Sequence, residues 1–202
     1  MNVLSEAFEP TSMSLLQRAR SNDQEAWNRL VQLYGPLVYR WCRRSNLNED
    51  DTADVFQETF RSVSSNLEKF SPQRETGSFR SWLRSIVRSK VVDHFRAANK
   101  NPKALGGTDA QMHLASVPDP LAEDSEDEEA NDQSLLVLRA MDMIKPEFTE
   151  RNWIAFQKVA LQGFSAPEVA KEFGISDQAV RQANYRIRRR LRIELRDLVE
   201  DV

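Results

Sequence analysis

Cysteine, histidine and glycine are scarce in this chain of 202 residues, which contains one, two and six of them. The single cysteine, Cys42, excludes a disulfide within the chain and a zinc site built from cysteines. His94 and His113 lie in segments of different character, and no glycine-rich loop is present to cradle a phosphate. No nucleophile stands with a general base. These absences predict a protein that is not an enzyme, with no catalytic residues, no cofactor and no metal site.

Long apolar runs are also missing, and no stretch has the length of a membrane span or the pattern of a signal peptide. Hydrophobic residues still make up 40% of the chain, which is enough for real cores. They recur at helical spacing, and no segment alternates convincingly as a strand does. We therefore expect an all-α protein of the reducing cytoplasm.

Acidic side chains are concentrated in one segment, although the formal net charge is only −3. Residues 118–132 hold no basic residue and many acids, at Asp119, Glu123, Asp124, Glu126, Asp127, Glu128, Glu129 and Asp132. Like charges following proline and glycine cannot bury surface, so residues 101–133 are predicted to form a flexible acidic linker between two small helical domains. The acids lack the spacing of a calcium loop. They could instead mimic nucleic acid and cover a basic face of the same chain.

Residues 165–191 carry the signals of a helix-turn-helix. Ser165 can cap the first helix while Glu168, three residues on, completes a capping box. Gly174 supplies the left-handed residue that ends this helix, and Ser176 can cap the next. The second helix has an apolar stripe at Val180, Ala183, Ile187, Leu191 and Leu195, and its other faces carry Arg181, Arg186, Arg188, Arg189, Arg190 and Arg192.

An arginine run of this kind is by itself most often a solvated helix face. The capped short helix and the glycine turn before it favour another interpretation. Together they predict a helix that lies in the DNA major groove, where arginine bonds guanine edges or phosphates.

The N-terminal half predicts further helices, over residues 12–20 and beginning at Asn22, Asn48 and Ser78. The helix that follows Asn48 is acidic on its polar side. The helix dipole explains Asp50 and Asp51, which stand near its start, but it explains Asp54, Gln57 and Glu58 less well.

The helix that follows Ser78 carries a basic ridge, formed by Arg80, Arg84, Arg88, Lys90, Arg96 and Lys100. Such a ridge suits a phosphate backbone. Trp82 and Phe95 lie among these cations, and two interpretations stay open for them. They stack on unpaired bases, or they are buried in the core.

In the order of these parts the chain resembles an extracytoplasmic-function (ECF) sigma factor of the sigma-seventy superfamily. Residues 51–60, DTADVFQETF, are similar to the family's region two-point-two, and residues 79–96, FRSWLRSIVRSKVVDHFR, are similar to its nucleic-acid segments. The helix-turn-helix is similar to region four. Trp82, Asp93 and Arg96 fall where the family pattern places them.

The resemblance implies a role for each surface. Core RNA polymerase, through the clamp helices of its largest subunit, would be bound by Asp51, Asp54, Gln57 and Glu58. The minus-ten element would be bound by Arg74, Arg80, Trp82, Arg84, Arg88, Lys90 and Arg96. The minus-thirty-five element would be bound by Ser176, Gln178, Arg181, Gln182, Tyr185, Arg186 and Arg189.

The resemblance also implies an organisation and a setting. A tail over residues 1–11 would precede region 2 over 12–100, and the linker over 101–133 would lead to region 4 over 134–202. The partners would be core RNA polymerase and promoter DNA, joined in many members by an anti-sigma factor. The protein would be cytoplasmic and associated with the nucleoid when in holoenzyme.

Two other classes of protein stay open. A helix-turn-helix regulator would bind duplex DNA without polymerase and usually as a symmetric dimer, but no dimer helix is evident here. A nuclease or helicase accessory would need clustered carboxylates or a phosphate loop. Co-purification with core polymerase would separate the three.

Overall fold

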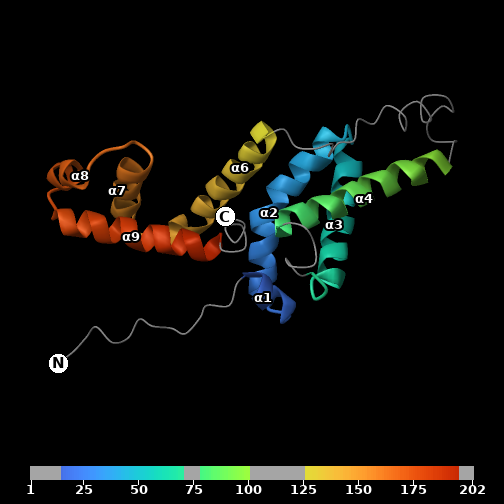
Figure 1. Cartoon of the computed structure of the whole chain (residues 1–202), viewed down its shortest axis with the longest axis horizontal. Helices are drawn as coiled ribbons and strands as arrows, with labels where there is room; N and C mark the ends of the chain where they lie inside the picture. The colour runs from blue at the N-terminus through green and yellow to red at the C-terminus, as the bar shows by residue number, and fades with distance from the viewer. Residues whose placement is uncertain (1–14, 71–77, 101–125, 196–202) are drawn as a thin grey trace.

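The computed structural model describes residues 15–70, 78–100 and 126–195, and every regular element in these segments is helical (Figure 1). The prediction of an all-α fold is therefore confirmed. The elements are α1 (Leu15–Arg20), α2 (Gln24–Arg44), α3 (Glu49–Asn66), α4 (Phe79–Lys100), α6 (Glu126–Ile144), the 3-10 turn η1 (Lys145–Glu147), α7 (Glu150–Ala160), α8 (Ala166–Phe173) and α9 (Asp177–Glu194).

Helices α1 to α4 form an N-terminal bundle around α2. The spacing of apolar residues along α2 buries Leu30, Leu37 and Trp41 completely. A cluster of aromatic rings closes the bundle where α4 begins, because Phe79 packs edge-on against Tyr34 with ring centroids 4.9 Å apart. Helix α2 thus supplies the central wall against which the other helices pack.

The helix starts in the bundle follow local capping chemistry, with one correction. Asn48 caps α3 as predicted, since its side chain accepts a hydrogen bond from the Asp51 N–H at 2.8 Å. Asn22 was predicted to cap α2 and does not. The cap is Asp23, whose carboxylate accepts from two backbone N–H groups, while Asn22 takes a left-handed turn conformation with φ 59°.

The C-terminal module consists of the end of α6 with α7, α8 and α9. Ile144, Trp153 and Ile187 form its inner core, and Val169 with Val180 closes the angle between α8 and α9. The predicted helix-turn-helix is confirmed in detail. Ser165 and Glu168 form the capping box, Gly174 ends α8 at φ 61°, and Ser176 caps α9.

The acidic linker was predicted to extend to residue 133, and its last part is helical instead. Helix α6 begins at Glu126, and the side chain of Asp132 is fully buried. Leu136 and Ala140, further along α6, belong to the hydrophobic cluster of the N-terminal bundle. Glu129 and Asp132 of α6 are accommodated because they meet arginine and tryptophan donors on the bundle. Residues 101–125 of the predicted linker lie outside the described residues, and the division into two domains stays a prediction.

Replacing Ser165 by alanine should destabilise the C-terminal module by about 1 kcal/mol, because the hydroxyl satisfies a backbone N–H that the helix cannot. Urea unfolding followed by circular dichroism measures this change. Ser134→Ala is a matched control, since that hydroxyl only bonds the Ala130 carbonyl inside α6 and should matter little. Equal losses in the two variants would contradict the role of the cap.

Candidate nucleic-acid and polymerase interfaces

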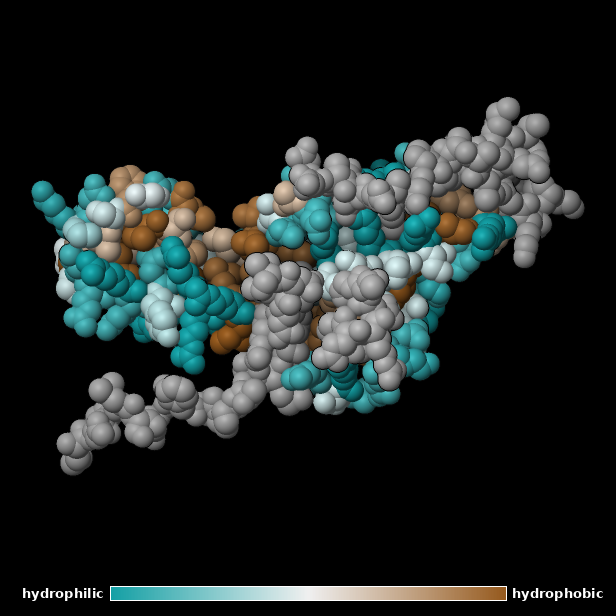
Figure 2. Space-filling model, viewed as in Figure 1, coloured by the Kyte–Doolittle hydropathy of each residue, from teal (hydrophilic) through white to brown (hydrophobic). Residues whose placement is uncertain are grey.

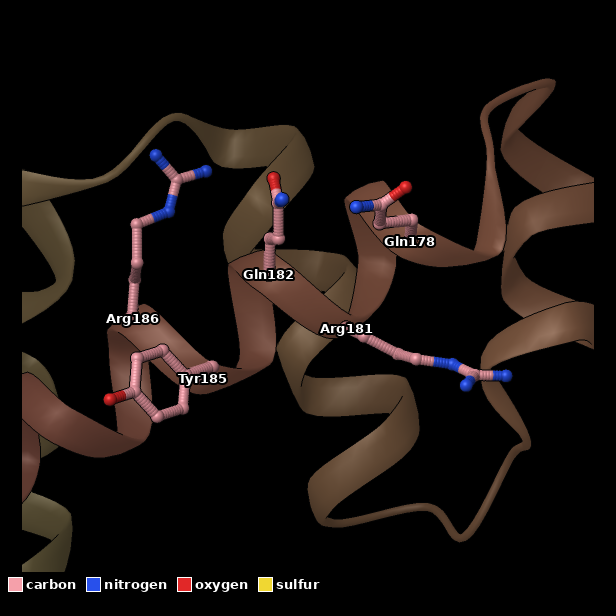
Figure 3. A pocket seen from close by; sticks show the side chains of 5 residues that line it. All are labelled: Gln178, Arg181, Gln182, Tyr185 and Arg186. Atoms are coloured by element: carbon pink, nitrogen blue, oxygen red, sulfur yellow. The ribbon is translucent and has the colours of Figure 1, made fainter. Parts of the chain in front are cut away.

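The first part of α9 presents a polar face to solvent. Gln178, Gln182 and Arg186 project from the same side of the helix, because they are four residues apart, and Arg181 and Tyr185 flank them (Figure 3). These five side chains line one shallow pocket. Tyr185 is 64% exposed, which is high for an aromatic ring. The face offers amide, guanidinium and phenol groups, which suit base edges and phosphates.

The opposite side of α9 fixes this face in place. Val180, Ala183 and Ile187 are buried against the rest of the C-terminal module, so rotation of the helix about its axis is prevented. The hydroxyl of Ser176, a predicted DNA contact, accepts a hydrogen bond from the Ala179 N–H at 3.2 Å and is engaged in the cap. Arg189, another predicted contact, is exposed but does not line the pocket.

Arg190 differs from the other arginines of the run. Its guanidinium group donates to Glu147 at 2.6 and 2.8 Å and to Glu194 at 2.7 Å. Glu194 also accepts two hydrogen bonds from Arg29 of α2, at 3.0 and 2.8 Å. This network ties α9 to the N-terminal bundle. Burial alone would raise the pKa of Glu194, but the hydrogen bonds from Arg29 and Arg190 outweigh it and hold that pKa below its usual range.

Helix α3 exposes three of the four residues predicted to bind polymerase. Asp54, Gln57 and Glu58 are exposed and lie within about one turn of each other, so they form one acidic patch. Asp51 has a different setting. Its carboxylate accepts from the Asn48 amide at 2.8 Å and lies 3.4 Å from the imidazole of His94 on α4. It therefore contributes to the packing of α3 against α4.

The cations of the predicted basic ridge on α4 differ in how far they are exposed. Arg88 and Arg96 are exposed, whereas Arg84 and Lys90 are half-buried. Arg80 is buried, with only 8% of its side chain exposed. Arg74, the remaining cation of the predicted minus-ten set, lies outside the described residues.

Trp82 and Phe95, the aromatic residues that lie among the cations of α4, differ in burial. Trp82 is 9% exposed, and its ring lies 4.9 Å from that of Phe70 and 5.6 Å from that of Phe79. In this structure it is a core residue, as one of the two interpretations predicted. Phe95 is half-buried against the bundle.

A cluster around Arg80 was not predicted from the sequence. Glu129 and Asp132 of α6 both pair with Arg80, and Asp132 also accepts a hydrogen bond from Trp41 Nε1 at 2.9 Å. One signal was present in the sequence. Asp132, Leu136 and Ala140 recur every four residues, as the buried face of a helix does.

Hydrophobic surface is visible where α6 lies between the N-terminal bundle and the C-terminal module (Figure 2). The exposed large hydrophobic side chains of α6 are Val137 and Leu138. Cys42 is buried, and burial raises the pKa of its thiol to about 11. Across the described segments, no group of three or more histidine, cysteine or acidic side chains could hold a metal ion, and none of the helices is long and apolar enough to cross a membrane.

Comparisons with known proteins relate this arrangement to transcription. Residues 30–101, from within α2 to just beyond α4, match the family Sigma-70 region 2. The chain is 29% identical over 179 residues to the ECF RNA polymerase sigma factor BldN of Streptomyces coelicolor, and the match covers 89% of this chain and 64% of BldN. It is 27% identical over 194 residues to the ECF RNA polymerase sigma factor SigE of Mycolicibacterium smegmatis, covering 91% of this chain and 67% of SigE.

By these matches the chain is similar to ECF RNA polymerase sigma factors. The family match covers α3 and α4, with their acidic patch and basic ridge, and ends before α6. The matches to individual relatives cover 85–91% of this chain and therefore extend into the C-terminal module. Among these, the RNA polymerase sigma factor CnrH of Cupriavidus metallidurans is 29% identical over 175 residues, which cover 85% of this chain and 87% of CnrH.

A solved structure described as CnrH in complex with the cytosolic domain of CnrY has 27% sequence identity to this chain. The match covers 88% of this chain and 92% of that one, with a TM-score of 0.36. At that score nothing about the arrangement of helices in this chain rests on the likeness.

Proposed function

We propose that this protein is a bacterial sigma factor that binds core RNA polymerase and directs promoter-specific initiation of transcription. The observation that supports it most is the presence, in one chain, of a Sigma-70 region 2 match and a separate helix-turn-helix whose second helix, α9, exposes a polar face. The sigma factor names of the relatives agree with it. The match to this chain spans 64% of the length of BldN.

The proposed mechanism is binding without bond chemistry in this chain. The acidic patch on α3 would hold polymerase, and the exposed side chains of α9 would read the minus-thirty-five element in the major groove. The cations of α4 would hold the separated strand of the minus-ten element. Opening each base pair costs a few kcal/mol, which contacts to the unstacked bases and phosphates would offset.

Reconstitution with core polymerase from the host tests this function. We expect the purified chain to co-elute with core polymerase and to direct transcripts with a defined start from genomic fragments. Polymerase without the chain is the control. A chain that binds duplex DNA as a dimer and never joins polymerase would favour the helix-turn-helix regulator instead.

Changing Asp54, Gln57 and Glu58 to alanine should weaken the complex with core polymerase about tenfold or more, a loss of about 1.4 kcal/mol. The fold should persist, because the three side chains are exposed and the ion pair of Glu58 with Arg61 lies on the surface. Binding of labelled protein to core polymerase measures the change.

The matched control for that triple variant is Asp142→Ala with Glu150→Ala, which removes two exposed acids from α6 and α7. Holoenzyme assembly should be unchanged in the control. Normal assembly by the triple variant would place the polymerase interface elsewhere.

The setting follows from the same proposal. A sigma factor acts where polymerase is, in the cytoplasm and on the nucleoid. An anti-sigma partner remains a prediction from the family. A pull-down from the host, with identification of the bound proteins, tests for polymerase subunits and for such an inhibitor together.

A further inference from the structure

The carboxylate of Asp132 lies in a buried cationic site on the N-terminal bundle. It has no exposed surface and accepts a hydrogen bond from Trp41 Nε1 at 2.9 Å. Arg80 Nη1 is 3.6 Å from one of its oxygens, and Arg40 Nη1 is 3.7 Å from the other. Glu129, one turn earlier on α6, pairs with the second terminal nitrogen of Arg80. Two guanidinium groups and an indole N–H therefore converge on acids from another part of the chain.

This set of donors is one that binds oxyanions in general. Arginine presents a planar fork of N–H groups that fits carboxylate and phosphate alike. The site also continues a larger cationic surface, because Arg80 begins the basic ridge of α4. The next cation of the ridge, Arg84, has its guanidinium carbon 5.8 Å from the centre of the Trp41 ring. A phosphate backbone that follows the ridge would reach this site.

We propose that Arg40, Trp41 and Arg80 form a binding site for a DNA backbone phosphate, and that α6 occupies this site with its own carboxylates in the structure described here. The inference rests on the proposed function, since it takes the ridge of α4 to be a DNA surface. Only 8% of the Arg80 side chain is exposed, so DNA reaches it only when α6 leaves. DNA and α6 thus compete, and whatever loosens α6 raises the affinity for DNA.

The remaining contacts of α6 explain why the occupied form is stable. Leu136 and Ala140 are fully buried in the cluster of the N-terminal bundle, and Arg139 donates to the Gln32 carbonyl of α2 at 2.9 Å. Removal of α6 would expose these apolar side chains as well as break the ion pairs. An ion cluster that only docks α6 would have the same contacts, so the test must report on phosphate itself.

The salt dependence of binding reports on phosphate contacts. Holoenzyme binding to a fragment on which it initiates is measured over a range of salt for wild type, Arg40→Gln and Arg44→Gln. The slope of log affinity against log salt is negative, and each lost phosphate contact decreases its steepness by about 0.7 for single strands and about 0.9 for duplex DNA. We expect this decrease for Arg40→Gln. Arg44→Gln removes the same charge one turn away on α2 and should keep the wild-type slope.

Competition by α6 is measured on the free full-length chain with a labelled, mixed-sequence single-stranded DNA. Glu129→Gln should tighten binding about two- to fivefold, the range expected for loss of a half-exposed ion pair. Asp142→Asn removes an equal charge from the same helix and should tighten binding less. In an Arg80→Gln background the gain from Glu129→Gln should disappear. Asp132→Asn, which keeps an acceptor for Trp41, is a second variant of the α6 acids that occupy the site. Circular dichroism checks that each variant is folded.

An unchanged slope for Arg40→Gln overturns the phosphate site. Equal gains from Glu129→Gln and Asp142→Asn, or no detectable binding by either, overturn α6 as the competitor. These failures are separate from that of the proposed function. A wild-type chain that initiates selectively with core polymerase keeps its proposed function whatever these variants do.

Discussion

Replacing both Arg181 and Arg186 by alanine should weaken binding of the holoenzyme to its promoters by roughly thirtyfold or more. Each arginine that contacts a base edge contributes about 1–3 kcal/mol, so the pair should lose about 2 kcal/mol at the least. Both side chains are exposed and line the same pocket of α9. Stability should change little, because the ion pair of Arg181 with Asp177 is long, at 4.0 Å, and exposed.

The measurement uses two promoter fragments, one intact and one with its upstream element scrambled. The double variant should lose most of the preference for the intact fragment. Arg188→Ala with Arg192→Ala is the matched control, since both residues are exposed on α9 but do not line the pocket. It should weaken binding to both fragments alike. If the two double variants prefer the intact fragment equally, the polar face of α9 is not the surface that reads the upstream element.

Replacing Glu194 by alanine should lower the free energy of unfolding by about 2–3 kcal/mol, because hydrogen bonds between charged groups contribute about 1.5–3 kcal/mol. Its side chain is 4% exposed and accepts from Arg29 and Arg190, which are 22% and 24% exposed. The substitution leaves both guanidinium groups with Glu147 as their acidic partner in this network. Urea unfolding of the full chain measures the loss, and Glu147→Ala, at a more exposed side chain, should cost less.

Acid should abolish this contribution. The pKa of Glu194 is lower in the folded chain than in the unfolded one, because the two arginines stabilise the ionised form. Its stabilisation is therefore complete above the unfolded-state value, about pH 4.3, and is lost as the pH falls through the lower folded-state pKa. The difference in stability between wild type and Glu194→Gln should shrink over that window. A difference that stays constant into strong acid would mean that the ionised carboxylate is not what stabilises α9 against α2.

Helix ends in this protein were predictable where the stabilising partner lies a few residues away. Ser165 with Glu168, Gly174 and Asn48 each satisfy backbone groups of their own helix, so the local sequence is sufficient. The error at Asn22 is a displacement by one residue, because the neighbouring Asp23 caps α2 instead. Helix α7 was not predicted, although its cap at Thr149 is a standard signal.

What the sequence could not give depends on partners far along the chain. From the sequence, Asp132 is expected to be a solvated acid, because its hydrogen-bond partner Trp41 is 91 residues away in the chain. Arg190 reads as one more exposed arginine until Glu147 and Glu194 are found against it. Burial of Trp82 likewise needs the position of Phe70. The roles of the exposed residues on α3, α4 and α9 stay predictions until the variants are measured.

The burial of Cys42 makes the protein well suited to spectroscopy. A thiol that is shielded from solvent and largely protonated reacts slowly with maleimides. Two cysteines introduced on exposed positions of α3 and α9 would thus accept a donor and an acceptor dye without removal of the native residue. Energy transfer between them would follow the separation of the two halves in single molecules, as polymerase and then promoter are added.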